Sequence, residues 1–431
     1  MKKHTLELTP RDLLFLRDAR PMEASDAGLG ANWPRPDQLY HALLSAFHLR
    51  WPERQPWEGE EHTRRWERDD IAFRFGALKT IGPFPKTKDG TVFFPRPLDL
   101  GMEIVKCEGT DLPAPLKYAF LPKAKGKASL PKWISESTYA RYLAGETVFD
   151  LEKEKDSSLY GADRNIGIGM DPATGTTKDG ALYQAEYLRL QEGVKLVCKA
   201  SCEMKLKRQD RILDAYDSEQ TGGECVEQVV LGGQQGMCSV DIDKTDFVLP
   251  MRPDNQTPTK FVRWTLLTPA VFQAGKEPDA KPGEPPKKQE GPVYGWLPAW
   301  CLRTDSERVY RDDVGKVMLS RPVEPRRPRE SRLDWKARQK AAGTIGAKLV
   351  AARIDKPLAF SGWNLATDRT LGGPKPTMLA VPAGSCYVFE CDTPDDAVAL
   401  AAALDGVPRS DLLGSNGFGI GVCSFVECPA S

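Results

Sequence analysis

The chain has 431 residues, of which 40% are hydrophobic, enough for more than one buried core. Sixty Lys and Arg residues balance sixty Asp and Glu residues, so the net charge does not mark a nucleic-acid binder and any basic surface must be local. No stretch approaches the roughly 18 consecutive apolar residues of a membrane span, and the first ten residues lack a signal-peptide pattern. We therefore expect a folded cytoplasmic protein without a membrane partner.

The first half of the chain predicts a strand, a helix and a hairpin. Residues 4–16 alternate as in a strand, and residues 38–50 carry apolar side chains at helical spacing, with Asp37 as the expected N-cap. The dipeptide Asp89-Gly90 predicts a hairpin turn between two apolar runs.

Further elements follow up to residue 242. A short helix is expected near residue 138, capped by Ser135 or Ser137 and ended by Gly145. Residues 180–190 and 194–206 predict two strands joined by a turn. Residues 226–242 predict one strand, broken by a glycine pair.

The second half begins a new unit at residues 259–272, where a β-rich run restarts after prolines. Residues 274–292 are rich in Pro, Gly and charge and predict a disordered insertion. Two strands, a helix at 393–406 and a last strand follow. The fold class we predict is α+β: two domains with antiparallel sheets, at 1–255 and 256–431, the second carrying a disordered and basic insertion at about 274–340.

Two glycine-rich stretches raise the question of a phosphate site. Gly167 and Gly169 precede a turn-rich loop, and the glycines of residues 414–421 precede a strand. A dinucleotide fingerprint needs a strand before it and a helix after it, so we expect no cofactor. Residues 414–421 are either a plain loop feeding an edge strand, or a backbone cradle for phosphates in which Phe418 stacks on a base.

Few residues offer acid–base or metal chemistry. His41 and His48 lie seven residues apart on one helical face and are either nuclease candidates or ordinary helix residues. Asp241 and Asp243 share one face of a strand, either as metal ligands or as half-exposed strand residues. We expect no catalytic residue and no metal site.

Residues 321–340 form a basic segment. Eight Lys or Arg residues stand against three acids, a local excess of five positive charges. Such a segment is typical of a solvated linker, but it also suits an arm that tracks an RNA backbone.

Taken in order, these motifs resemble the third subunit of the Cmr complex, a family of RNA-binding RAMP proteins found in type III-B CRISPR effectors. The matching motifs are RDARP at 17–21, WPRP at 33–36, HAL at 41–43, PRPLDL at 95–100, RNIGIG at 164–169 followed by the dipeptide LY at 182–183, LGGQ at 231–234, LLTPAVF at 266–272, SGWNL at 361–365, PAGSCYVFE at 382–390 and GFG at 417–419. The chain departs from the family pattern at Met22, where phenylalanine is common, and at Gln234, where an acid is common.

The resemblance implies two ferredoxin-like domains and a non-catalytic role. Such subunits bind the repeat-derived 5′ handle of the guide crRNA at the foot of the effector. They also dock against the large polymerase-containing subunit and the first backbone subunit. Motif by motif, it implies RNA contacts at Arg17, Arg20, Arg164, Gly167, Gly169, Trp363, Gly417, Phe418 and Gly419. Trp363 is equally typical of a core residue.

Two alternatives remain open at this point. One is a RAMP endoribonuclease that processes crRNA precursors with His41 or His48 as the base. The other is the equivalent handle-binding subunit of another type III subtype.

Overall fold

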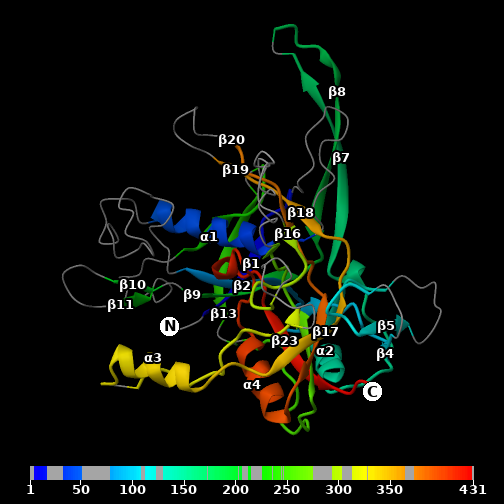
Figure 1. Ribbon diagram of the computed structural model, residues 1–431. Helices are drawn as coiled ribbons and strands as arrows, with labels where there is room; N and C mark the ends of the chain where they lie inside the picture. Colours follow the sequence, from blue (N-terminus) through cyan, green and yellow to red (C-terminus); the bar gives the residue numbers. More distant parts are fainter. Residues whose placement is uncertain are drawn as a thin grey trace, which may run out of the picture.

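The computed structural model (Figure 1) describes most of the chain. The described residues are 4–16, 33–50, 78–107, 112–122, 130–171, 173–201, 203–205, 212–214, 226–234, 236–243, 245, 247–274, 294–302, 313–327, 329–364 and 373–429. Over these ranges, no helix is long and apolar enough to cross a membrane.

A five-stranded antiparallel sheet organises the N-terminal half, in the order β12-β13-β1-β9-β2. The strands are β1 (His4–Pro10), β2 (Lys79–Lys86), β9 (Lys195–Ser201), β12 (Gln228–Val230) and β13 (Met237–Asp243). Helix α1 (Pro36–Arg50) packs on this sheet, and its Leu39, Leu43 and Phe47 share a core cluster with Leu6 and Leu8.

A four-stranded antiparallel sheet organises the C-terminal half, in the order β17-β22-β14-β23. The strands are β14 (Phe261–Leu266), β17 (Ala347–Arg353), β22 (Cys386–Cys391) and β23 (Gly421–Val426). Helix α4 (Pro394–Leu404) begins where the Thr393 side chain accepts a hydrogen bond from Asp396 N, and it packs Leu400 and Leu404 into the core around Trp264.

The two halves share a third core cluster. It is built around β3 (Phe93–Pro95), β6 (Trp133–Ser135) and α2 (Glu136–Leu143). Phe84 and Tyr139 from the first half pack in it with Leu267 and Ile420 from the second. Because apolar side chains of both halves are buried together, this cluster holds the two sheets as one body.

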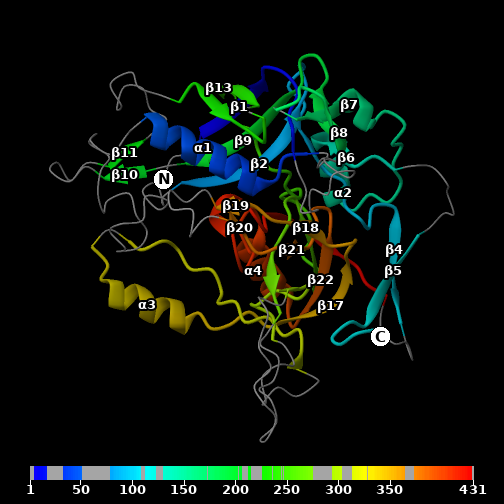
Figure 2. The same cartoon turned by 90° about the horizontal axis from the view of Figure 1, so that it is seen from above.

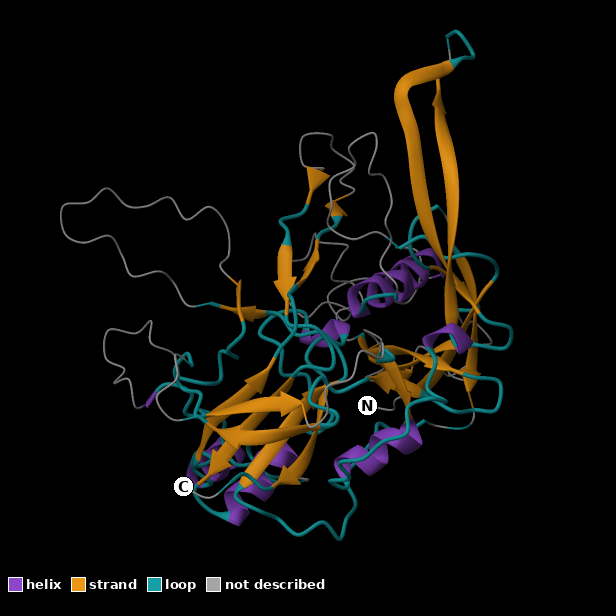
Figure 3. Cartoon of the chain, turned by 90° about the vertical axis from the view of Figure 1, so that its right-hand side faces the viewer, coloured by secondary structure: helices purple, strands orange, loops and turns teal. Residues whose placement is uncertain are grey.

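Several pairs of strands and one helix lie outside the two main sheets (Figure 3). The longest pair is the hairpin of β7 (Tyr160–Met170) and β8 (Thr177–Leu190). Besides the pair of β3 with β6, the remaining pairs are β4 (Met102–Lys106) with β5 (Tyr118–Pro122), β10 (Glu203–Lys205) with β11 (Ile212–Asp214), β15 (Phe272–Gln273) with β16 (Tyr294–Gly295), β18 (Leu358–Phe360) with β21 (Met378–Ala380), and β19 (Trp363–Asn364) with β20 (Gly373–Pro374). The short 3-10 turns are η3 (Asp156–Ser158) and η5 (Gly414–Asn416), and the outlying helix is α3 (Arg332–Ala341).

The α+β class with antiparallel sheets is confirmed, and so are the cap at Ser135 and the helix end at Gly145. Asp37 is not the cap of α1, because the helix begins at Pro36 and places Asp37 in its first turn. The disordered insertion predicted at 274–292 falls almost entirely on residues outside the described ranges.

The strand arrangement departs from the sequence pattern in two places. Residues 164–170, for which no strand was predicted, belong to strand β7, which pairs with β8. The strands predicted at 180–190 and 194–206 are joined by a turn as expected, but they are not neighbours in a sheet. Residues 226–242 are not one strand: the chain reverses at Gly232, whose φ of +85° needs a glycine, and β12 folds back on β13. The turn at Asp89-Gly90 is confirmed, since Thr87 N donates to Thr91 O at 3.0 Å and Lys86 forms an antiparallel bridge with Val92. The hairpin ends there, because β3 pairs with β6.

Candidate nucleic-acid interface

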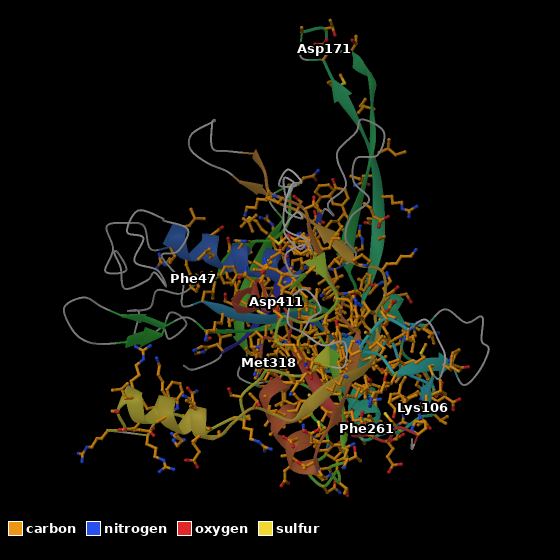
Figure 4. All side chains as sticks on the ribbon, in the orientation of Figure 1. Phe47, Lys106, Asp171, Phe261, Met318 and Asp411 are labelled. Atoms are coloured by element: carbon orange, nitrogen blue, oxygen red, sulfur yellow. The ribbon has the colours of Figure 1, made fainter. Side chains whose placement is uncertain are left out.

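The β7–β8 hairpin projects far beyond both sheets (Figures 1 and 3). Its tip is closed at Asp171, which Figure 4 labels at the far end of the molecule. Asp171 N donates to Thr176 O at 2.9 Å, Gly175 N donates to Asp171 O at 2.8 Å, and Ala173 N donates to Asp171 Oδ1 at 2.8 Å. Gly175 has a φ of +65°, which suits this tight turn. The hairpin is thus an ordered two-stranded ribbon closed by a turn that runs from Asp171 to Gly175.

Apolar side chains on this ribbon face solvent. Ile166 is 72% exposed, Ile168 is 50% exposed and Met170 is 54% exposed. Strand alternation puts Ile166 and Ile168 on the same face as Arg164. Arg164 Nε donates to Glu186 Oε2 at 2.9 Å while its side chain stays 62% exposed. An exposed apolar row beside an arginine on a projecting ribbon is typical of a surface that meets a partner.

The two motif glycines lie on the same ribbon. Gly167 pairs with Tyr183, and the register shifts between Ile168 and Met170, at Gly169. A glycine inside a strand weakens packing but permits a bulge or a close backbone approach. The position of Gly169 is explained by the bulge.

Three segments that are far apart in the sequence meet at the base of the hairpin. Leu14 exchanges backbone hydrogen bonds with Leu188 of β8, at 2.9 and 2.8 Å. The Phe15 ring lies 5.3 Å from the Tyr187 ring, and Tyr187 Oη donates to Gln234 Oε1 at 2.6 Å. The residue that departs from the family pattern, Gln234, therefore holds the hairpin base as a neutral acceptor.

Arg17 and Arg20 lie outside the described residues. The last described residues before them are Leu14, Phe15 and Leu16, and Gly233 N donates to Phe15 O at 2.8 Å. The chain therefore enters the arginine motif directly from the hairpin base.

The C-terminal glycine loop lies at the junction between the two halves of the protein. Phe418 is 0% exposed and stacks on Phe360 at 5.5 Å, and the Arg35 guanidinium lies 5.0 Å from the Phe360 ring. Gly417 has a φ of +93°, and a Cβ there would come within 2.8 Å of Thr80 O. Phe418 therefore presents no ring face to an RNA base in this structure.

The peptide N–H groups of the same loop are also used internally. Gly417 N donates to Gly414 O at 3.1 Å, Phe418 N to Leu413 O at 3.3 Å, and Gly419 N to Pro269 O at 2.7 Å. Gly419 has a φ of +73°, and a Cβ would collide with the Ser410 backbone. The geometry favours a structural loop over a phosphate cradle, because its backbone donors already have acceptors.

The remaining candidates are scattered. Trp363 lies in β19, opposite Pro374, and its side chain is outside the described part of the structure, as is that of His48. His41 is exposed on α1; partial desolvation and the nearby Lys375 ammonium lower its pKa. None of the described contacts of the hairpin base involves His41.

Asp243 of β13 belongs to an ion-pair network with Glu7, whereas Asp241 lies exposed on the same strand. Lys86 Nζ lies 2.6 Å from both Asp243 Oδ2 and Glu7 Oε1, and Lys195 Nζ lies 2.6 Å from Glu7 Oε2. Burial opposes ionisation of Asp243, yet hydrogen bonds from Lys86 and Thr245 lower its pKa to about 2. Lysines therefore neutralise these carboxylates. Within the described ranges, no group of three or more His, Cys, Asp or Glu side chains could hold a metal ion.

Comparison with known proteins gives the family. Residues 6–423 match the family described as CRISPR-associated protein (Cas_Cmr3). The chain belongs to this family. Members of the Cmr3 family are subunits of the type III-B CRISPR effector, the Cmr ribonucleoprotein, so the resemblance drawn from the ordered motifs is confirmed.

Two solved structures are similar to this Cmr3 family member at low identity. One is titled "Cryo-EM structure of the Type III-B Cmr-beta bound to cognate target RNA and AMPPnP, state 1", with 13% identity, 89% of this chain and 86% of that chain covered, and a TM-score of 0.41. The other is the Cmr-beta complex bound to cognate target RNA, with 13% identity, the same coverage of 89% and 86%, and a TM-score of 0.39. No curated protein sequence matches the chain.

Proposed function

We propose that this chain is a non-catalytic scaffold subunit that binds the 5′ handle of the guide crRNA at the foot of the Cmr complex. It would dock there against the large polymerase-containing subunit and the first backbone subunit. The observation that carries the proposal is the hairpin base. There residues 14–16, which precede the RDARP motif, and Gln234 of the LGGQ motif both contact β8, the strand that pairs with the RNIGIG strand β7.

The chemistry of the hairpin suits single-stranded RNA. Glu186 accepts from Arg164 Nε, which leaves the other guanidinium donors on a side chain that is 62% exposed. Arginine binds phosphates through such donors, and splayed bases bury their faces against apolar or aromatic side chains. Ile166, Ile168 and Met170 would supply those apolar contacts, and Gly167 and Gly169 would let the backbone approach. Neither contact needs an acid or a base.

Arg17 and Arg20 complete the proposed interface. They follow directly after Leu16 at the hairpin base, and the motif match assigns them to RNA. Trp363 stays a proposed contact on its motif alone. For Gly417, Phe418 and Gly419 the burial of the loop supports a structural role, which would keep the two halves aligned beneath the RNA.

We also propose that each half, 1–255 and 256–431, is a ferredoxin-like domain. If the edge strand β12 is left out and strands are counted within each half in chain order, β13-β1-β9-β2 is the order fourth, first, third, second, and β23-β14-β22-β17 is the same order. All neighbours are antiparallel, α1 links the first two strands of the first half, and α4 links the last two of the second. This order and these crossovers are those of a split βαβ fold.

A binding assay tests the function. The double variant Ile166→Ser/Ile168→Ser should bind a repeat-derived 5′ handle RNA roughly tenfold more weakly, because losing about 60 Å² of apolar contact at about 25 cal/mol per Å² costs about 1.5 kcal/mol. Fluorescence anisotropy with the full chain would measure it. The matched control is Val248→Ser/Met251→Ser, which removes two exposed apolar side chains, each 61% exposed, away from the hairpin.

Equal affinity of both double variants for the handle would refute the hairpin as the binding surface. The non-catalytic role is tested separately by incubating the protein with repeat RNA in the absence of metal. Cleavage that disappears in His41→Ala would show an endoribonuclease instead.

A further inference from the structure

Residues 321–343 leave the second sheet and return to it at one point; we call this segment the basic arm. At its base Arg321 N donates to Gly343 O at 3.0 Å, and Arg321 Nη2 binds Asp396 Oδ1 at 2.6 Å. Beyond the base, α3 lies apart from both sheets in two perpendicular views (Figures 1 and 2). The basic arm is therefore anchored at one end and open to solvent along its length.

Internal bonds hold the basic arm in shape. The Ser331 side chain caps α3 by accepting from Asp334 N at 3.0 Å, and α3 buries none of its residues. Arg338 binds Glu330 Oε2 at 2.9 Å and donates to the carbonyl oxygens of Glu324, at 3.1 Å, and Pro325, at 3.3 Å. One face of the helix is thus tied to the preceding segment, and the fold makes no use of the other face.

That outward face is basic. Arg332, Lys336 and Lys340 are exposed and follow each other at intervals of four residues, which aligns them along one side of α3 about 6 Å apart. Arg326 and Arg329 extend the exposed charge ahead of the helix. In Figure 4 several side chains of α3 point away from the body of the protein and end in nitrogen.

The three acids of the basic arm are engaged elsewhere. Glu330 pairs with Arg338, whose hydrogen bond lowers the pKa of that carboxyl and keeps it charged. Glu324 pairs with Arg327 at 3.0 Å, and Asp334 accepts from Ser331 Oγ at 2.7 Å. The stripe of cations is therefore not interrupted by a carboxylate.

The composition of this surface separates a nucleic-acid partner from a protein partner. Protein interfaces have an apolar or aromatic centre from which charge is depleted. Here the outward face offers Leu333, which is 78% exposed, beside three cations. A row of cations with little apolar area is what a phosphate backbone recruits, through the release of its counterions.

We propose that the basic arm binds the phosphate backbone of an RNA strand without regard to base sequence. It would be a second RNA surface: in Figure 1 the basic arm and the β7–β8 hairpin lie at opposite ends of the molecule. The inference stands on the charge of the arm alone and does not need the hairpin to bind the handle.

The experiment compares two triple variants of the full chain. Arg332→Ala/Lys336→Ala/Lys340→Ala removes the stripe, and Lys88→Ala/Lys153→Ala/Lys356→Ala removes the same charge from exposed sites elsewhere. Binding of fluorescent oligouridine RNA is measured between 50 and 200 mM salt. Loss of three phosphate contacts should lower the slope of log K against log salt by about 2 and weaken binding roughly 100-fold near 0.1 M salt.

Folding and specificity controls keep the result interpretable. Because Arg332, Lys336 and Lys340 are exposed and α3 has no fully buried residue, the stripe variant should unfold at the wild-type temperature. Its affinity should fall by the same factor for oligouridine and for handle RNA. In contrast, Ile166→Ser/Ile168→Ser should lower the affinity for handle RNA more than the affinity for oligouridine. An unchanged salt slope in the stripe variant, or equal losses of RNA affinity in both triple variants, would overturn the proposal. So would a stripe variant that keeps its RNA affinity but no longer retains an acidic Cmr subunit in the assembled complex.

Discussion

The buried ion pair between the two halves gives the sharpest prediction about stability. Arg263 Nη1 lies 3.2 Å from Asp99 Oδ2, and the two side chains are only 11% and 3% exposed. Tyr142 Oη donates to Asp99 Oδ1 at 2.6 Å, and the Arg263 guanidinium lies 3.8 Å from the Tyr142 ring centre. Asp99 belongs to the first half and Arg263 to the second, so this pair ties the halves together.

Asp99→Asn keeps the size of the side chain but leaves Arg263 charged without a counter-ion. Breaking a buried pair costs about 3–5 kcal/mol. We expect the lower end, about 3 kcal/mol, because Arg263 keeps its hydrogen bonds to Tyr142 O at 3.0 Å and to Ser424 Oγ at 3.1 Å. That is a large share of the ~5–15 kcal/mol that stabilises a typical domain.

Urea denaturation followed by tryptophan fluorescence measures the loss. Asp99→Asn/Arg263→Met should be more stable than Asp99→Asn by at least about 1 kcal/mol, because the second change removes the stranded charge. The matched control is Glu390→Gln, which breaks the exposed pair with Lys117, where the side chains are 51% and 38% exposed. If Asp99→Asn and Glu390→Gln cost the same, or if Arg263→Met gives no recovery, the electrostatic account of the junction is wrong.

Three further predictions concern other regions. Asp243, with a pKa of about 2, adds stability that is present above its unfolded pKa near 3.8 and is lost as the pH falls toward 2. The unfolding temperature should therefore fall as the pH is lowered through this range, which we call the acid limb. Lys86→Met removes the partner of Asp243 and should make this fall less steep. Gly417→Ala should lower stability by more than about 1 kcal/mol, because it strains a φ of +93° and presses a methyl group on Thr80 O. Ser331→Ala should reduce the helicity of α3, because loss of an N-cap typically costs about 1 kcal/mol and no packing compensates it; circular dichroism measures the change.

Each of these has its own control. An acid limb of the same steepness in wild type and Lys86→Met would contradict the pairing with Asp243. Gly90→Ala measures the cost of backbone strain alone. Gly90 also has a positive φ, +92°, but nothing lies within 4 Å of the added Cβ. Equal losses at Gly90 and Gly417 would show that contact with Thr80 contributes nothing. Ser410→Ala lies away from α3, and helicity should fall in Ser331→Ala alone.

Much of the candidate site could be inferred before the structure was known. The ordered series of short motifs predicted the family, and the family match over residues 6–423 confirms it. Arg164 and the two glycines of β7 were singled out from the same motifs. Their arrangement could not be inferred: a run of glycines with few large side chains is typical of a loop, and only pairing with β8 makes it a strand.

The role of Phe418 could not be inferred from the sequence. A phenylalanine between glycines is an equally good stacking platform or core residue by composition, because both uses need an apolar ring with open backbone around it. What decides is whether another ring is present, and Phe360, 58 positions away in the chain, stacks on it.

Helix α3 could have been predicted from the serine at its N-cap and the acid three residues later, but the arginine-rich segment before it obscured the helical pattern.

The sequence by itself determined several local elements of this protein: the turn at Asp89-Gly90, the helix cap at Ser135, the helix at 393–406, and alternating strands of both sheets. Those signals act over a few residues, so they can be recognised without knowledge of the fold. Tertiary structure alone decided that β8 leaves the body as a ribbon, and that Leu14 and Gln234 meet at its base. It also buried Phe418 and left α3 exposed. The physical reason is that burial and strand pairing depend on contacts between residues tens to hundreds of positions apart, on which local patterns carry no information.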